Sequence, residues 1–85
     1  MADEKIGVVV KFFVKPSVAA IEVTSGGIKT GDLLRFRGHT TDFTEQVQSM
    51  QVDNKPVEEA PPGSMVGIRV KERVRENDDV YKVVD

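Results

Sequence analysis

The chain contains no cysteine and no tryptophan, and it has one histidine among its 85 residues. Without thiols it cannot form a disulfide, a thiolate nucleophile or a zinc–thiolate site. The single histidine, His39, cannot build a zinc site alone, and no obvious nucleophile accompanies it, so we expect it to serve in a turn. We therefore expect no metal, no cofactor and no catalytic residue.

A long apolar run and a phosphate-binding glycine loop are also missing. The charged start, residues 1–5, leads directly into a strand pattern, which indicates neither a signal peptide nor a membrane span. No Gly-x-x-x-x-Gly-Lys-Ser/Thr segment is present, so we expect the chain to bind no GTP of its own. The sequence predicts a cytoplasmic protein without a membrane partner.

Composition bounds the size and class of the protein. With 39% hydrophobic and 31% charged residues, the chain has the make-up of a soluble globular protein. Its length predicts one domain over residues 1–85, with an ordered core at about 5–84. The net charge of −2 argues against nonspecific binding of nucleic acid, but it leaves room for a local basic face.

The first strand is predicted over residues 6–15, where apolar residues alternate with a period of two. Pro16 cannot donate to a ladder and should end it. The predicted inner face holds Ile6, Val8, Val10, Phe12 and Val14, and the outer face holds Gly7, Val9, Lys11, Phe13 and Lys15.

Similar alternation predicts further strands over residues 17–24, 33–38, 44–52, 64–71 and 80–84. Their expected inward residues are Ala19, Ile21, Val23, Leu34, Phe36, Val66, Ile68 and Val70.

A β-bulge near Gln48-Ser49 would reconcile the spacing of Val47 and Met50, and residues 57–60 could form one helical turn. Glycine-marked turns are expected at 25–27, 30–32 and 62–63. We expect an all-β fold, a single small closed antiparallel β-barrel of six to seven strands.

Three segments occur in an order typical of one family: Gly26-Gly27-Ile28-Lys29-Thr30-Gly31-Asp32-Leu33-Leu34, Val47-Gln48-Ser49-Met50-Gln51 and Val57-Glu58-Glu59-Ala60-Pro61-Pro62-Gly63-Ser64-Met65-Val66-Gly67-Ile68. With them the chain resembles the β-barrel second domain of translational GTPases, the elongation factor Tu and initiation factor 2 group. It resembles even more the stand-alone elongation factor-like proteins that consist of this barrel only. The resemblance implies contact with the ribosome, and a pocket for the aminoacyl end of tRNA near Ser49, Gln51 and Met65.

Cations on the predicted outer surface offer a second group of candidates. Lys11 and Lys15 flank Phe13, a combination that suits stacking on the bases of single-stranded RNA. Arg35 and Arg37 share one face of their strand, and an extended chain would also align Arg69, Lys71, Arg73 and Arg75. The alternative is an ordinary solvated surface, because Glu72 and Glu76 are interspersed.

The sequence therefore predicts noncatalytic binding of RNA or a translation component through Lys11, Phe13, Lys15, Arg35, Arg37, Arg69 and Lys71. The alternative is a protein-interaction or accessory-subunit module, or a self-associating one, since similar barrels are appended to larger enzymes such as the collagenase-like peptidases. An exposed apolar residue such as Val9 or Phe13 would favour that alternative. Glu58 and Glu59 are adjacent in an extended segment and point opposite ways, which argues against a catalytic carboxylate pair.

Overall fold

Ten short strands make up the secondary structure of residues 2–84, the part of the chain that the computed structural model describes. They are β1 (Ala2–Phe13), β2 (Val18–Val23), β3 (Ile28–Lys29), β4 (Leu33–Arg37), β5 (Asp42–Gln46), β6 (Met50–Val52), β7 (Lys55–Val57), β8 (Glu59–Ala60), β9 (Met65–Arg69) and β10 (Asp79–Val84). Nowhere in this part of the chain is there a helix that could cross a membrane. The all-β class is confirmed, whereas the predicted number of strands was too small.

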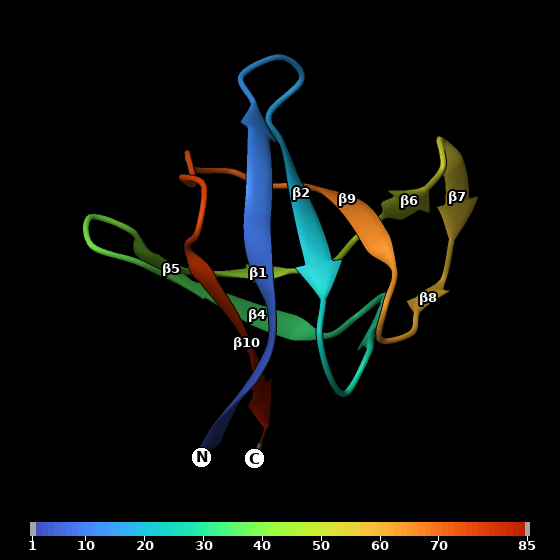
Figure 1. The fold of residues 1–85 in the computed structure, drawn as a ribbon, viewed down its shortest axis with the longest axis horizontal. Helices are drawn as coiled ribbons and strands as arrows, with labels where there is room; N and C mark the ends of the chain where they lie inside the picture. Colours follow the sequence, from blue (N-terminus) through green and yellow to red (C-terminus); the bar gives the residue numbers. More distant parts are fainter. Residues whose placement is uncertain (1, 85) are drawn as a thin grey trace.

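Eight of the strands form one antiparallel sheet, in the order β5-β4-β10-β1-β2-β9-β6-β7, and β3 pairs with β8 in a separate small ladder. The sheet is strongly rolled, with β4 and β5 running across the view behind β1 and β2 (Figure 1). Its end strands β5 and β7 do not pair with each other within residues 2–84, so the predicted closed barrel is wrong. Pro56 lies in β7, and a residue without an N–H is tolerated at a sheet edge.

The hydrophobic core fills the inside of the rolled sheet. Side chains from both halves meet there, including Ile21 of β2, Ile68 of β9 and Phe36 of β4, each fully buried. Phe36 stacks on Phe43 of β5, with ring centroids 5.1 Å apart. The predicted inward residues of the second, third and fifth expected strands are all buried, so those predictions are confirmed: Ala19, Ile21, Val23, Leu34, Phe36, Val66, Ile68 and Val70.

Strand β1 departs from simple alternation because its pairing shifts twice. The register changes between Lys5 and Gly7 against β10, and between Val9 and Lys11 against β2. Each extra residue reverses which side chains face the core. The inward residues of this strand are consequently spaced by three.

The two shifts overturn part of the predicted face of the first strand. Val9, expected outside, is completely buried, while Val10 and Val14, expected inside, are 42% and 66% exposed. Hydrogen bonds explain the position of Val9, since its N–H donates to the carbonyl of Asp78 and its carbonyl accepts from Asn77. Phe13 remains on the outer face, as predicted.

Two further local predictions are wrong. The expected strand over residues 44–52 is two strands, β5 and β6, which lie far apart in the sheet order. The break falls where a bulge was expected, and both Val47 and Met50 are buried. Backbone hydrogen bonds of Val47 with Gly31 and Asp32 hold the link between the two strands. Residues 57–60 form no helical turn, since Glu59 and Ala60 are extended as β8.

The glycine turns are where the sequence predicts them. Gly63 has φ of 93°, and the N–H of Ser64 donates to the carbonyl of Pro61, so residues 61–64 make a type II turn at the predicted position. Gly31 has φ of 96° in the turn before β4. The turn at Gly31 thus precedes β4, and the turn at Gly63 precedes β9.

Candidate functional site

The outer face of β1, β2, β9 and β6 is a grid of cross-strand rows. Directly paired residues point to the same side of an antiparallel sheet, and so do residues two apart on one strand. The first row is Phe13–Val18–Arg69, the second Lys11–Ala20–Gly67–Gln51, and the third Glu22–Met65. The middle of the grid therefore carries the two smallest residues, Ala20 and Gly67.

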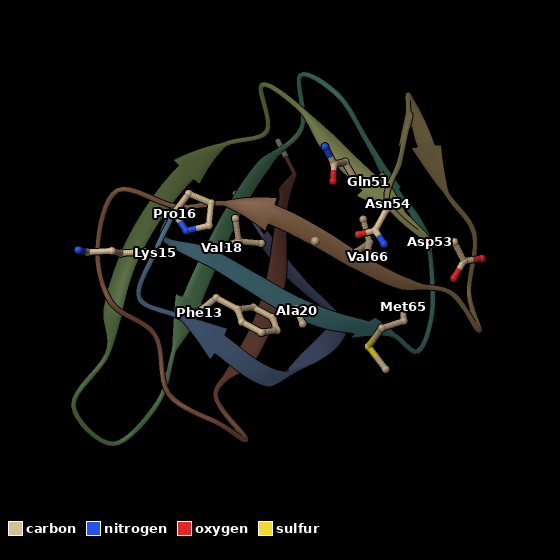
Figure 2. A pocket seen from close by; sticks show the side chains of 11 residues that line it. Phe13, Lys15, Pro16, Val18, Ala20, Gln51, Asp53, Asn54, Met65 and Val66 are labelled. Atoms are coloured by element: carbon tan, nitrogen blue, oxygen red, sulfur yellow. The ribbon is translucent and has the colours of Figure 1, made fainter.

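A groove of about 390 Å³ lies over these small residues. Figure 2 shows Phe13, Ala20 and Met65 along one side of it and Gln51 and Asn54 along the other. Phe13 is 44% exposed and Met65 47%, although both are large apolar side chains. The groove thus has one apolar wall and one wall of amides.

The amide wall is held by the β6–β7 hairpin. Val52 pairs with Lys55, and the two residues between them, Asp53 and Asn54, have φ of 52° and 63°. Positive φ at both central residues is the geometry of a tight hairpin turn that favours Asp and Asn. Side-chain amides donate and accept hydrogen bonds, so this wall is suited to the backbone of an extended chain.

The groove continues toward a cationic end. A second hollow of about 310 Å³ shares Pro16, Val18, Gln51 and Gly67 with the first and reaches Ser49 and Arg69. A third, of about 250 Å³, adds Lys71 and Glu45 beyond them. One of the Glu45 carboxylate oxygens accepts the backbone N–H of Lys71 at 2.7 Å.

The pocket candidates that the family resemblance implied and several of the predicted outer-surface residues lie together on one surface. Phe13, Lys15, Gln51 and Met65 line the first hollow, Ser49 and Arg69 the second, and Lys71 the third. Lys11 is adjacent to them, with its Nζ 5.2 Å from the centroid of the Phe13 ring, a cation–π contact.

Arg35 and Arg37 do not join this surface. They lie on β4, which β10 and β1 separate from β2. Arg35 is held by acids: its Nε and Nη2 donate to both oxygens of Asp42, at 2.9 and 3.0 Å, and its Nη1 lies 3.4 Å from Asp3. Its charge is thus already neutralised, so the structure offers no continuous basic face that includes Arg35.

The Arg35–Asp42 pair makes a testable prediction about pH. Hydrogen bonding from Arg35 lowers the pKa of Asp42 below its ordinary value, and the Asp42 carboxylate raises the pKa of Arg35. A depressed carboxyl pKa stabilises the fold above about pH 4, and that contribution is lost as the pH falls through the folded-state pKa. We expect Arg35→Gln to raise the Asp42 pKa in an NMR titration of the carboxyl carbons, whereas Arg69→Gln should leave it unchanged. An unaltered Asp42 pKa in Arg35→Gln would contradict the pairing.

The other charged candidates are dispersed. Strand β9 ends at Arg69, and both Val70 and Val74 beyond it are buried, so the cations at 71, 73 and 75 do not continue one extended face.

His39 is exposed in the turn where the N–H of Gly38 donates to the carbonyl of Thr41. Glu58 and Glu59 are exposed, and Glu59 lies 3.8 Å from Lys29. Within residues 2–84 no group of three or more His, Cys, Asp or Glu is placed to hold a metal.

Sequence reasoning missed the floor and part of one wall of the groove: Val18, Ala20, Gly67 and Asn54. Ala20 and Gly67 have outward parity in their strands, and two small outward residues indicate a depression when their strands are neighbours. The pairing of β2 with β9 could not be read from the sequence, so the two positions were not connected.

Comparisons with known proteins identify relatives outside translation. No protein-family model matches the chain. It is 45% identical over 78 residues to an uncharacterized protease of Methanocaldococcus jannaschii, and 33% identical over 78 residues to a collagenase of Porphyromonas gingivalis. Each match covers 91% of this chain but only 19% and 22% of the relative. The chain thus spans about a fifth of the length of these relatives.

Solved structures agree with the sequence matches. Two crystal structures of the C-terminal domain of a Geobacillus thermoleovorans protein, described as a U32 peptidase, superimpose with TM-scores of 0.84 and 0.87 at 19% identity. The matches cover 91% and 95% of this chain, and 96% and 93% of those chains. The resemblance to translation factors is therefore wrong, together with the RNA or ribosome partner inferred from it. The cytoplasmic location and the self-association stay predictions. The fold of this chain is that of the C-terminal domain of a U32 peptidase, and its relatives in sequence are proteases.

Proposed function

We propose that this domain is a noncatalytic polypeptide-binding domain that acts with a U32-type peptidase, and that its groove holds an extended segment of the protein substrate. The observation that carries the proposal is the groove on the outer face of β1, β2, β9 and β6, with Phe13 and Met65 opposite Gln51 and Asn54. An apolar wall takes side chains, and an amide wall holds backbone groups.

The size of the groove supports a short segment as the occupant. Its volume of about 390 Å³ is near the lower end of ligand sites, which run from about 300 to 1,000 Å³. That space accommodates a few residues of an extended chain rather than a folded domain. Large exposed apolar side chains beside a depression mark interaction sites more often than isolated exposed ones do.

The lining also supports binding without catalysis. Ser49 is a hydroxyl that lines the second and third hollows, but His39 lies in the β4–β5 turn, away from all of them. Glu45 and Lys71 share the third hollow with Ser49, yet within residues 2–84 neither side chain is hydrogen-bonded to it, and the Glu45 carboxylate accepts the Lys71 backbone N–H instead. A hydroxyl nucleophile needs a base within hydrogen-bonding distance. Hydrolysis would thus belong to another part of the peptidase, and this domain would position the substrate.

The relatives suggest the first probe. The Porphyromonas gingivalis proteins are named collagenases, so denatured collagen (gelatin) is a reasonable substrate to test. We expect gelatin to shift the amide NMR signals of the outward residues of β2, β6 and β9 in the isotope-labelled 85-residue chain. A reduced and alkylated noncollagenous protein serves as a second unfolded substrate.

Phe13→Ala is expected to weaken gelatin binding about tenfold. Truncating a central aromatic residue at an interface typically costs 1–2 kcal/mol or more, and about 1.4 kcal/mol corresponds to a factor of ten. Fluorescence anisotropy of labelled gelatin measures the change. Leu33→Ala is the matched control, because Leu33 is 40% exposed but lies on β4 and lines none of the connected hollows.

Three outcomes would overturn the proposal. The first is that neither unfolded protein binds, and the second is that both shift signals only away from the groove. The third is that Leu33→Ala weakens binding as much as Phe13→Ala does, which would indicate nonspecific binding to exposed apolar residues.

A further inference from the structure

We propose that the groove selects substrate segments in which an apolar residue and an acidic residue lie a few residues apart. This inference rests on the proposed function and deepens it, because it assigns each end of the groove its own chemistry. Phe13, Ala20 and Met65 would take the apolar residue, and Arg69 would take the carboxylate.

Charge along the groove is unequal at its two ends. Arg69 lies in the first row of the grid, and Lys15 lies at the same end (Figure 2). Neither forms an ion pair in the described part of the chain, residues 2–84. Asp53 lies at the opposite end, beyond Met65 (Figure 2), and Glu22 pairs with Met65 in the third row. A bound acidic residue is attracted to one end and repelled from the other.

Glu45 is the carboxylate that faces the cationic end. It lines the third hollow with Arg69 and Lys71, and its Oε1 accepts the Lys71 backbone N–H. That hydrogen bond holds the Glu45 side chain at Lys71, on the far side of Arg69 from the apolar wall. Arg69 therefore remains the cation that borders the second hollow, where Ser49 is a further hydrogen-bond donor.

The grid also sets the spacing of the two ligand residues. Arg69 lies one strand across and one row along from Ala20 in the groove floor. Neighbouring strands are about 4.8 Å apart, and residues two apart on a strand about 6.8 Å, so the two Cα positions are about 8 Å from each other. Because the arginine side chain adds its own reach, an extended ligand spans the distance between the two sites in about two to four residues.

Three synthetic peptides test the inference. The first is acetyl-Gly-Leu-Pro-Gly-Glu-Gly-amide, and the second has Gln in place of Glu. The third has that Gln and a free carboxylate in place of the C-terminal amide. We expect the Glu peptide to bind the 85-residue chain about three- to fivefold more tightly than the Gln peptide, as for a partly exposed ion pair, and the difference to shrink with added salt. Calorimetry or NMR titration measures the three affinities.

Arg69→Gln should remove most of the preference, so that the Glu and Gln peptides bind with similar affinities and only a small difference remains from Lys15 at the same end. Arg37→Gln is the matched control with the same change of charge, because Arg37 lies on β4 away from the groove. We expect Arg37→Gln to keep the full preference.

The outcomes separate this inference from the proposed function. If no peptide binds, the acidic selectivity is wrong, and if gelatin does not bind either, the proposed function fails as well. If all three peptides bind equally and Phe13→Ala weakens each of them, the groove binds polypeptide but the acidic selectivity is wrong. Tighter binding of only the free-carboxylate peptide would assign the cationic end to a chain terminus and overturn the inference. Groove signals that shift on concentrating the chain alone would assign the groove to a second copy, with the same consequence.

Discussion

Phe36→Ala is expected to destabilise the domain by about 3–5 kcal/mol, the range for truncating a fully buried aromatic residue. Phe36 of β4 has no exposed surface and is paired with Val80 on one side and Phe43 on the other. Its ring also stacks on that of Phe43. A chain of this length has roughly 4–13 kcal/mol of total stability, so the loss is a large fraction of the whole. Urea denaturation followed by circular dichroism measures it.

The matched variant is Phe13→Ala, the same substitution on the other face of the sheet. Phe13 is 44% exposed, so we expect its truncation to change the free energy of unfolding by about 0.5 kcal/mol or less. Equal losses in the two variants would mean that the assignment of core and outer faces is wrong. A small loss in Phe13→Ala also establishes that weaker gelatin binding by this variant does not reflect unfolding.

Sequence patterns predicted the fold well where one strand keeps one period. The alternation in β2, β4 and β9 placed Ala19, Phe36 and Ile68 in the core, and all three are buried. The same reasoning failed for β1, because a β-bulge adds one residue to a strand without changing the types of residue that the strand contains. Val9 and Val10 are identical in type, and only the pairing with β2 decides which of them faces the core.

The groove could be predicted only in part, for a related reason. Strand parity predicted the outward position of Phe13, and the family resemblance made Gln51 and Met65 pocket candidates, although that family was wrong. What joins them is the order of strands, which places β1, β2, β9 and β6 side by side. Such long-range pairings leave no local pattern, so the sequence could not show that the residues share one surface.

The mistaken family has a physical explanation as well. The segments that supported it, residues 26–34 and 57–68, are built from glycine and proline turns followed by short alternating strands. Those features report the turn geometry of a small β domain, and many domains with different functions share it. Function therefore has to be inferred from side chains on the outer face, such as Arg69 and Phe13, because the turn residues reflect only the fold.

Gly7→Ala is expected to lower the free energy of unfolding by about 3 kcal/mol, even though it adds only one methyl group. Gly7 lies where β1 bends between its two partners, paired with Val23 on one side and Val80 on the other. An added Cβ would lie 2.5 Å from the carbonyl oxygen of Glu22 and 3.0 Å from Cγ2 of Ile21. Because the oxygen belongs to the backbone of a paired strand, it cannot rotate away, and the β1–β2 ladder would have to separate.

Gly67→Ala provides the contrast that isolates this cause. Gly67 is also a strand glycine without positive φ, but its Cβ would meet the Cγ1 side-chain atom of Val18 at 3.3 Å, which a small rotation relieves. We expect a change within about 1 kcal/mol, since removing a glycine also lowers the entropy of the unfolded chain. Thermal and urea unfolding of both variants would measure the difference. If Gly7→Ala were as stable as Gly67→Ala, the close approach of β1 to Glu22 would be wrong, and with it the pairing of Gly7 with both β2 and β10.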